Sequence, residues 1–137
     1  MSERLTLGRR LRAVADRIPA SCRRLADIGT DHGYIPAELL LTGRLDRAIA
    51  ADIGREPLER ARRTAQRYGL EDRMELRLGD GLRVLTPGEA DVIVIAGMGA
   101  DAVASILTAA PWVRDGPLLL LQPMSKTEVL RRYLPEH

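Results

Sequence analysis

The chain has 137 residues, of which 45% are hydrophobic and only 3% aromatic, and it carries a formal net charge of +2. This length suits one domain, residues 1–137, with a core of aliphatic side chains. The single cysteine, Cys22, excludes a disulfide framework, and no apolar run reaches the roughly 18–20 residues of a membrane-spanning helix. We therefore expect a cytoplasmic protein without a signal peptide or a membrane segment.

An amphipathic helix is the first element that the sequence predicts, over residues 4–18 of an N-terminal segment 1–18 that precedes a core of residues 23–137. Its apolar side chains recur at helical spacing and form one stripe. Three arginines lie off this stripe, where they either contact an anionic partner such as RNA or form an ordinary solvated face. The stripe residues are Leu7, Leu11, Val14, Ala15 and Ile18, and the arginines are Arg9, Arg10 and Arg12.

The segment Leu25–Pro36 follows, and its pattern predicts a short buried strand, a glycine turn and the start of a helix. Gly29 and Gly33 permit a tight turn in which the backbone can approach a ligand closely. The helix after the turn directs free backbone N–H groups toward the same place. A strand, a glycine turn and a helix at the start of an α/β sheet indicate a site for a nucleotide-type cofactor.

Asp31, between the two glycines, favours one class of cofactor over another. A dinucleotide fingerprint has the spacing G-x-G-x-x-G and neutral residues, because a pyrophosphate lies against the backbone. A carboxylate in that position repels a diphosphate and attracts a cation. The pattern therefore favours S-adenosylmethionine (SAM), whose sulfur is positively charged. An NAD-type nucleotide-binding protein is the less favoured alternative.

Strands and helices alternate along the rest of the chain. Strands are expected over residues 45–52, 74–78, 91–96 and 118–121. One helix is expected over residues 57–68, another follows the strand at 91–96 and ends at residue 110, and a last one begins at about residue 125. With residues 23–29 this gives five strands, which predict a doubly wound, mostly parallel α/β sheet with right-handed crossovers. The loops after the strands then gather at one edge, where such sheets bind ligands.

Further groups are expected at that edge. Asp52 ends the second strand and can accept hydrogen bonds from both hydroxyls of a ribose, in NAD as well as in SAM. Asp80 follows the third strand, within reach of an adenine amino group, although a plain turn also explains it. The glycine loop 96–100 follows the fourth strand. The sequence has no cluster of metal-ligating residues, so we expect no metal site.

Four segments of the sequence together carry a family resemblance: residues 27–36 (DIGTDHGYIP), 79–82 (GDGL), 95–100 (IAGMGA) and 121–123 (LQP). They resemble the bacterial tRNA adenine-N1 methyltransferases that act in the D-arm region. The resemblance covers nearly the whole chain and implies a class I, Rossmann-like methyltransferase sheet. It also implies SAM as the methyl donor and N1 of a tRNA adenine as the acceptor.

The resemblance and the turn chemistry together suggest the site residues. Asp31 is the first candidate for a catalytic carboxylate beside the reacting adenine, with Asp27 behind it, and an equal alternative is that Asp31 only positions SAM. For His32 and Tyr34, local bonding and packing are the alternatives to ligand contact. The expected SAM-binding set is Asp27, Gly29, Asp31, Gly33, Tyr34, Asp52, Ile53, Asp80, Gly81, Ala96, Gly97 and Met98. The expected substrate-binding set is His32, Arg9, Arg10, Arg12, Gln122 and Pro123.

Members of that family usually continue with a further strand pair and a helical C-terminal extension thought to grip tRNA, and we expect this chain to lack both. The strand at 118–121 would then keep an unpaired apolar edge, through which copies of the chain could associate. Two functions follow as alternatives. One is methyl transfer to adenine N1, and the other is a shortened module that binds SAM or RNA without transferring a methyl group.

Overall fold

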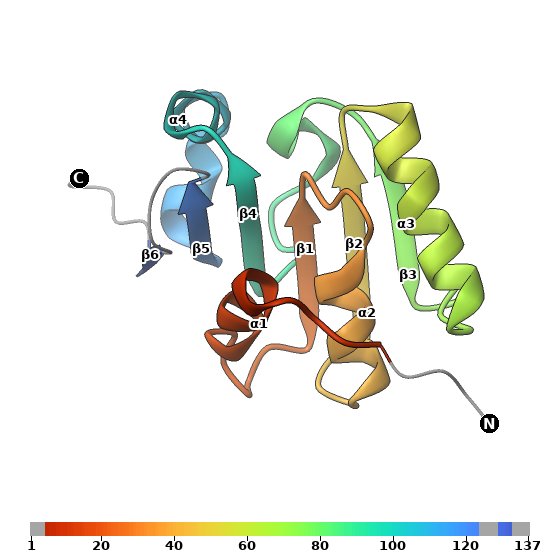
Figure 1. The fold of residues 1–137 in the computed structure, drawn as a ribbon. Coiled ribbons are helices and arrows are strands. Elements are labelled where there is room, and N and C mark those ends of the chain that lie inside the picture. Colours follow the sequence, from red (N-terminus) through yellow and green to blue (C-terminus); the bar gives the residue numbers. More distant parts are fainter. Residues whose placement is uncertain (1–4, 124–128, 133–137) are drawn as a thin grey trace.

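A six-stranded sheet forms the middle of the computed structural model, which describes residues 5–123 and 129–132 (Figure 1). Its strands lie in the order β3-β2-β1-β4-β5-β6. The strands β1 to β5 are parallel, and β6 runs antiparallel to β5. Their bounds are β1 (Arg24–Ile28), β2 (Arg47–Asp52), β3 (Met74–Leu78), β4 (Val92–Met98), β5 (Leu118–Pro123) and β6 (Val129–Arg132).

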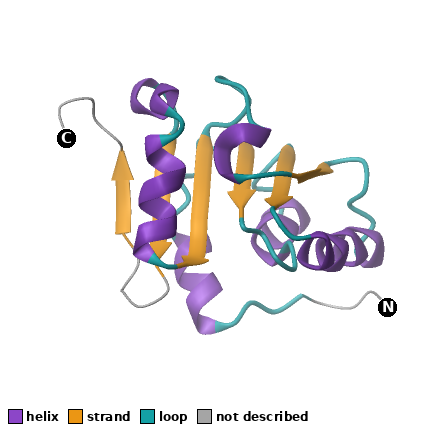
Figure 2. Ribbon diagram, turned by 90° about the horizontal axis from the view of Figure 1, so that it is seen from above, coloured by secondary structure: helices purple, strands orange, loops and turns teal. Residues whose placement is uncertain are grey.

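Helices cover both faces of the sheet (Figures 1 and 2). One face is covered by α1 (Arg9–Asp16), α2 (Tyr34–Leu41) and α3 (Arg55–Arg67). The other is covered by α4 (Ala100–Thr108) and two short 3₁₀ helices, η1 (Gly81–Val84) and η2 (Pro111–Asp115). The predicted doubly wound, mostly parallel α/β architecture is therefore confirmed. No helix in the described part of the chain is long and apolar enough to cross a membrane.

The central strands are apolar along most of their length because both of their faces are covered. Successive side chains of a strand point to opposite faces of the sheet. In β4, Val92 and Val94 pack on the side of α1 and α2, whereas Ile93 and Ile95 pack on the side of α4. None of these four residues is more than 2% exposed. The two cores thus hold β4 from both sides and fix where its carboxyl end lies.

The C-terminal part differs from two predictions. The edge of β5 is not unpaired, because β6 pairs with it and Leu121 lies opposite Val129. One strand beyond the expected five is therefore present, and the basis for association of copies through this edge is lost. The last helix expected from residue 125 is wrong over Val129–Arg132, which is strand, and residues 124–128 lie outside the described residues. A four-residue strand is too short to show alternation, and the hydrogen bonds that define it come from β5.

Several element boundaries also differ from the prediction. β4 continues past Ala96 to Met98, through a bulge at Gly97, whose φ is 74°. The loop expected over residues 96–100 is therefore mostly strand. Helix α1 begins at Arg9 rather than at residue 4, and α3 begins at Arg55 rather than at residue 57.

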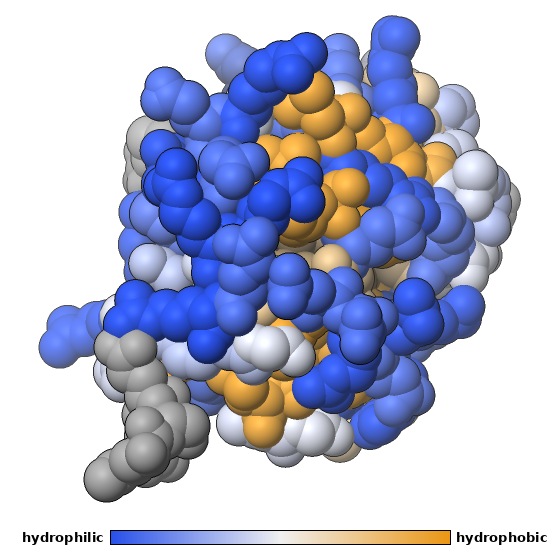
Figure 3. All heavy atoms as spheres, turned by 90° about the vertical axis from the view of Figure 1, so that its right-hand side faces the viewer, coloured by the Kyte–Doolittle hydropathy of each residue, from blue (hydrophilic) through white to orange (hydrophobic). Residues whose placement is uncertain are grey.

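The opposite edge of the sheet, β3, lies beside α3 on the face seen in Figure 3. This face is largely hydrophilic, with hydrophobic atoms exposed between the charged groups (Figure 3). Arg77 of β3 donates to both carboxylate oxygens of Glu89 at 2.8 and 2.7 Å and to Glu75 at 2.9 Å. Charged groups along an edge strand oppose the addition of a further strand. The strand expected over residues 74–78 is confirmed, and it lies at the edge of the sheet.

Candidate functional site

A cavity of about 270 Å³ opens at the carboxyl ends of β1, β4 and β5. The loop after β1 forms its floor, and α1 borders it. Residues far apart in the sequence meet here because parallel strands all end at this edge. Nine of the predicted site residues line the cavity: Arg10, Asp27, Gly29, Asp31, His32, Tyr34, Ala96, Gly97 and Gln122.

The loop after β1 has an unusual backbone, with left-handed φ values at Gly29 (74°), Asp31 (56°) and Gly33 (71°). Such φ values are unfavourable for residues other than glycine, and aspartate is among the few that tolerate them. A Cβ atom built on Gly29 would overlap Cε of Met98, the flexible end of that side chain, so it is the left-handed φ rather than lack of space that favours glycine here. The predicted glycine turn is thus present, and the Met98 side chain lies over it.

Asp52, at the end of β2, connects two loops at the rim of the site. Its Oδ2 accepts a hydrogen bond from the backbone N–H of Asp31 at 3.1 Å, and its Oδ1 accepts one from that of Gly54 at 3.0 Å. The next residue, Ile53, has 71% of its surface exposed, which is unusual for a large aliphatic side chain. The carboxylate of Asp52 and the exposed side chain of Ile53 are therefore adjacent. A ribose could bond to the first while the base attached to it packs against the second.

Asp31 lines the cavity, but its carboxylate also faces α3. The Arg60 guanidinium donates to Asp31 Oδ1 through Nη2 at 2.7 Å and through Nε at 3.0 Å. Arg60 is absent from the residues that the sequence suggested for the site. The two residues are 29 positions apart, so no local pattern signals the pair. Because Arg60 balances its charge, Asp31 alone does not give the cavity a negative potential.

Asp27 is the most deeply buried carboxylate of the cavity, with 4% of its surface exposed. The pKa of Asp27 is raised from 3.8 to about 7, mainly by burial; the hydrogen bond from Thr30 opposes this rise, and the nearby charge of Asp52 contributes to it. That bond runs from Thr30 Oγ to Asp27 Oδ2 at 2.8 Å. Sequence reasoning missed Thr30, although a threonine three residues after a strand-end aspartate could have signalled the contact.

His32 and Tyr34 form one unit at the entrance of the cavity. Their rings are stacked, with centroids 4.8 Å apart and planes 9° from parallel. His32 Nε2 also lies 3.8 Å from Asp31 Oδ2. The local contacts considered from the sequence are therefore present, and both side chains still line the cavity.

Asp80 and Gly81 lie at a second cavity of about 200 Å³, between η1, α4 and η2. Gly81 has a φ of 58°, and a Cβ atom there would approach Ile106 to 3.1 Å. Trp112 also lines this cavity. The residues that follow β3 thus line a second cavity, separate from the one at the end of β1.

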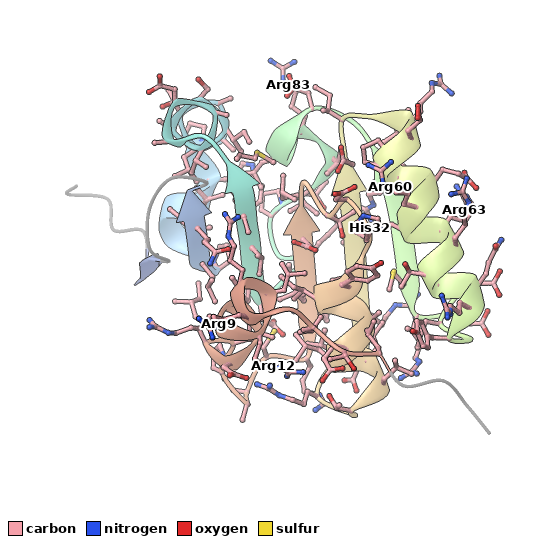
Figure 4. All side chains as sticks on the ribbon, viewed as in Figure 1. Arg9, Arg12, His32, Arg60, Arg63 and Arg83 are labelled. Carbon is pink, nitrogen blue, oxygen red and sulfur yellow. The ribbon has the colours of Figure 1, made fainter. Side chains whose placement is uncertain are left out.

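The remaining candidates are scattered. Arg12 of α1 forms an ion pair with Glu38 of α2 at 2.9 Å, and Arg9 projects outward from α1 (Figure 4). Of the three predicted α1 arginines, only Arg10 reaches the cavity. The backbone of Pro123 pairs with Met98, and its side chain lies outside the description. Within the described ranges, no group of three or more His, Cys, Asp or Glu side chains could hold a metal ion.

Comparison with known proteins places this geometry in a family. The family described as Methyltransferase domain matches residues 7–137. The chain belongs to this methyltransferase-domain family. Its curated relatives include the tRNA (adenine(22)-N(1))-methyltransferase of Bacillus subtilis (strain 168), which is 40% identical over 131 residues. That alignment covers 95% of this chain and 55% of the relative.

Solved structures agree with this family assignment. This methyltransferase domain matches the crystal structure of the B. subtilis M1A22 tRNA methyltransferase TrmK with a TM-score of 0.82 and 41% identity, over 88% of this chain and 51% of that one. It matches Streptococcus pneumoniae Sp1610, a putative tRNA (m1A22) methyltransferase in complex with S-adenosyl-L-methionine, with a TM-score of 0.78 and 33% identity. The latter match covers 86% of this chain and 56% of that one. The methyltransferase domain thus spans about half the length of the relatives it matches.

Proposed function

We propose that this chain binds SAM at the carboxyl ends of β1 to β4 and transfers the methyl group to N1 of an adenine in tRNA. The observation that carries the proposal is the 40% identity to the B. subtilis tRNA (adenine(22)-N(1))-methyltransferase over 95% of this chain. The complex of the S. pneumoniae relative with SAM supports the choice of cofactor. A tRNA substrate would also agree with a cytoplasmic location.

The residues at the site fit the chemistry of SAM. Gly29 lines the cavity and has no Cβ atom, so a polar ligand can approach its backbone once the flexible Met98 side chain over it moves aside. Asp52 would accept hydrogen bonds from the ribose hydroxyls, with Ile53 against the adenine ring. Asp80 and Gly81, at the second cavity, would meet the exocyclic amine of that ring.

The charges at the site also favour a cationic ligand over a pyrophosphate. Three carboxylates lie at or beside the cavity, those of Asp27, Asp31 and Asp52, and only Asp31 is paired with an arginine. A diphosphate would be repelled by the carboxylates of Asp31 and Asp52, whose charge the single cation of Arg60 offsets in part, and by the ionised form of Asp27. The electrostatic argument therefore rests on all three carboxylates rather than on Asp31 alone.

The proposed chemistry is a direct displacement at the methyl carbon. SAM supplies a methyl group bonded to a positively charged sulfur, and N1 of adenine has an in-plane lone pair that attacks without prior deprotonation. The work of the chain is then to hold the adenine in line with that methyl group, an effect worth up to roughly 7–11 kcal/mol in favourable cases. The adenine gains positive charge as it reacts, so an aspartate near the ring, Asp31 or Asp27, would stabilise it. N1 is normally paired, so the reacting base must be unpaired or flipped out.

A transfer assay tests this function. The purified 137-residue chain is incubated with SAM carrying a labelled methyl group and with an unmodified tRNA transcript. We expect label in the tRNA, dependent on both the chain and the RNA. Binding of SAM or tRNA without any transferred label would contradict the proposal and leave a non-catalytic module. Micromolar binding of NADH by a chain inert toward SAM would contradict the choice of cofactor.

A further inference from the structure

A groove of about 420 Å³ lies next to the cofactor cavity, between the segment before α1 and the helix α3. The groove and the cavity share a wall, because His32 and Tyr34 line both of them. Their stacked rings separate the two spaces. A ligand in the groove would therefore lie one side-chain layer away from the proposed site of methyl transfer.

Arginines of α3 line one side of this groove. Arg60, Arg63 and Arg67 are spaced three and four residues apart, so they share one face of the helix. The row extends over roughly 10 Å along the helix axis. Figure 4 shows Arg60 beside His32, with Arg63 projecting from α3. No acidic side chain in the described part of the chain lines the groove.

Two of these arginines can accept a further anionic partner. Arg63 is exposed and has no ion pair or hydrogen bond with any described residue. Arg60 uses Nε and Nη2 for its bonds to Asp31, and a guanidinium carries five N–H donors in all. A phosphate in the groove could thus bond to Arg63 and to the remaining donors of Arg60 while the pair with Asp31 stays intact.

Aromatic rings line the other parts of the groove. Tyr68, at the end of α3, is half-buried, and the Arg67 guanidinium lies 5.8 Å from the centre of its ring. Tyr34 contributes the second ring, already stacked on His32. Single-stranded RNA is bound by this combination, in which arginines contact the phosphates and aromatic rings stack on unpaired bases.

We infer that this groove binds the single-stranded RNA that flanks the reacting adenine. This inference rests on the proposed function, which requires an adenine taken out of its base pair and hence an unpaired strand beside it. Arg60 and Arg63 would hold the phosphates, and Tyr68 would stack on a neighbouring base. The groove suits RNA better than the outer face of α1, where Arg12 is already paired with Glu38 and Arg9 projects away from the site.

Charge removal at two adjacent arginines tests the inference. Arg63→Ala removes a groove cation, whereas Arg62→Ala removes the neighbouring arginine of the same helix, which is paired with Glu59 and does not line the groove. Binding of a transcribed tRNA is measured by filter binding at several salt concentrations, without methyl transfer. We expect Arg63→Ala to weaken binding roughly three- to tenfold and to lower the salt dependence by about one ion, and Arg62→Ala to change neither. The affinity for SAM should be unchanged in both variants.

Replacing Tyr68 by Leu tests stacking separately. This variant keeps an apolar side chain at the end of α3, and thermal melting checks that it is folded. We expect weaker binding of an unpaired oligoribonucleotide without a change in salt dependence, because no charge is removed.

Failure of the inference and failure of the proposed function give different results. A chain that methylates tRNA but whose Arg63→Ala and Arg62→Ala variants bind RNA equally well would overturn the groove alone. Equal weakening in both variants would also overturn it, because the effect would then be one of general charge. Wild-type chain that binds no tRNA would overturn it as well. Selective weakening by Arg63→Ala with no label transferred would leave the RNA site and refute the methyltransferase function.

Discussion

The carboxylate of Asp52 accepts the backbone N–H of Asp31 at 3.1 Å, which ties the end of β2 to the loop after β1. Its other oxygen accepts the N–H of Gly54, at the start of α3. One side chain therefore fixes two backbone segments that border the proposed SAM site. Asp31 needs such support, because its φ of 56° is unfavourable for a residue with a Cβ atom.

Replacing Asp52 by Asn should impair SAM binding. The variant places an amide NH₂ where one carboxylate oxygen now accepts an N–H, and it removes the charge available to the ribose hydroxyls. Losing hydrogen bonds to a charged group is worth about 1.5–3 kcal/mol, so we expect affinity to fall roughly tenfold or more by isothermal titration. Asp46→Asn is the matched control, because Asp46 is an exposed aspartate paired with Arg23 outside the cavity. An Asp52→Asn variant that binds SAM as well as this control would contradict the assignment.

Gly29→Ala should lose both stability and SAM binding. A residue with a Cβ atom in the left-handed region costs roughly 1–2 kcal/mol, and the new methyl group also displaces the flexible end of the Met98 side chain, at little further cost. Gly43→Ala is the control, because its φ of 77° carries the same strain with nothing within 4 Å of the new atom. Urea denaturation should show similar losses in the two variants. Equal SAM affinity for Gly29→Ala and Gly43→Ala would exclude close approach of the cofactor at Gly29.

The pH dependence of SAM binding should reflect Asp27. Burial raises the pKa of Asp27 from 3.8 to about 7 in the folded chain, so it ionises near neutral pH. A cationic ligand favours the ionised form, and if binding lowers this pKa by about one unit, affinity rises roughly tenfold between pH 5.5 and 8. Asp27→Asn should flatten that rise in a titration series. A wild-type profile as flat as that of the variant would exclude a SAM contact with this carboxylate.

The raised pKa of Asp27 also predicts how the stability of the chain depends on pH. The direction is opposite to that for a carboxylate in an ion pair, whose pKa is lowered. Between the unfolded value of 3.8 and the folded value of about 7, the folded chain holds a proton on Asp27 that the unfolded chain has lost. The contribution of Asp27 to stability therefore falls as pH rises through this range and is constant above it. Relative to the wild type, Asp27→Asn should gain stability from pH 4 to pH 7, as measured by urea denaturation.

The Arg77–Glu89 pair should contribute to stability at neutral pH and lose this contribution in acid. Hydrogen bonds from Arg77 and from the backbone of Thr86 lower the pKa of Glu89 from 4.5 to about 2. The contribution is present above pH 4.5 and disappears as pH falls toward 2. Because Glu89 is partly exposed, we expect Glu89→Gln to cost only about 1 kcal/mol at pH 7. Glu75→Gln, a more exposed partner of Arg77, should cost less. An equal effect of the two substitutions, or a Glu89 effect that persists at pH 2, would contradict this account.

Features encoded by neighbouring residues could be predicted from the sequence. The alternation of apolar and charged side chains gave β3 its bounds, Met74–Leu78, and the glycines after β1 predicted the turn that forms the cavity floor. The carboxyl-edge position of Asp52 followed from the parallel topology alone. In each case a periodic or steric rule acts over a few residues and leaves a visible pattern.

Features that depend on distant partners could not be predicted. Arg60 belongs to an exposed face of α3 by its spacing, and only the packing of α3 beside the first loop brings it to Asp31. β6 is a strand because β5 offers a free edge, a condition absent from its own four residues. The burial of Asp27, which raises its pKa, likewise depends on elements packed around the end of β1.

Nucleoside analysis of the methylated tRNA tests the central claim most directly. The chain is incubated with isotopically labelled SAM and unmodified tRNA, the RNA is digested to nucleosides, and the labelled product is identified by mass spectrometry against standards. Methyl transfer to the ring nitrogen predicts label in 1-methyladenosine, reduced in Asp52→Asn and retained in Asp46→Asn. Label in N6-methyladenosine or in another nucleoside, or none in any, would contradict the account.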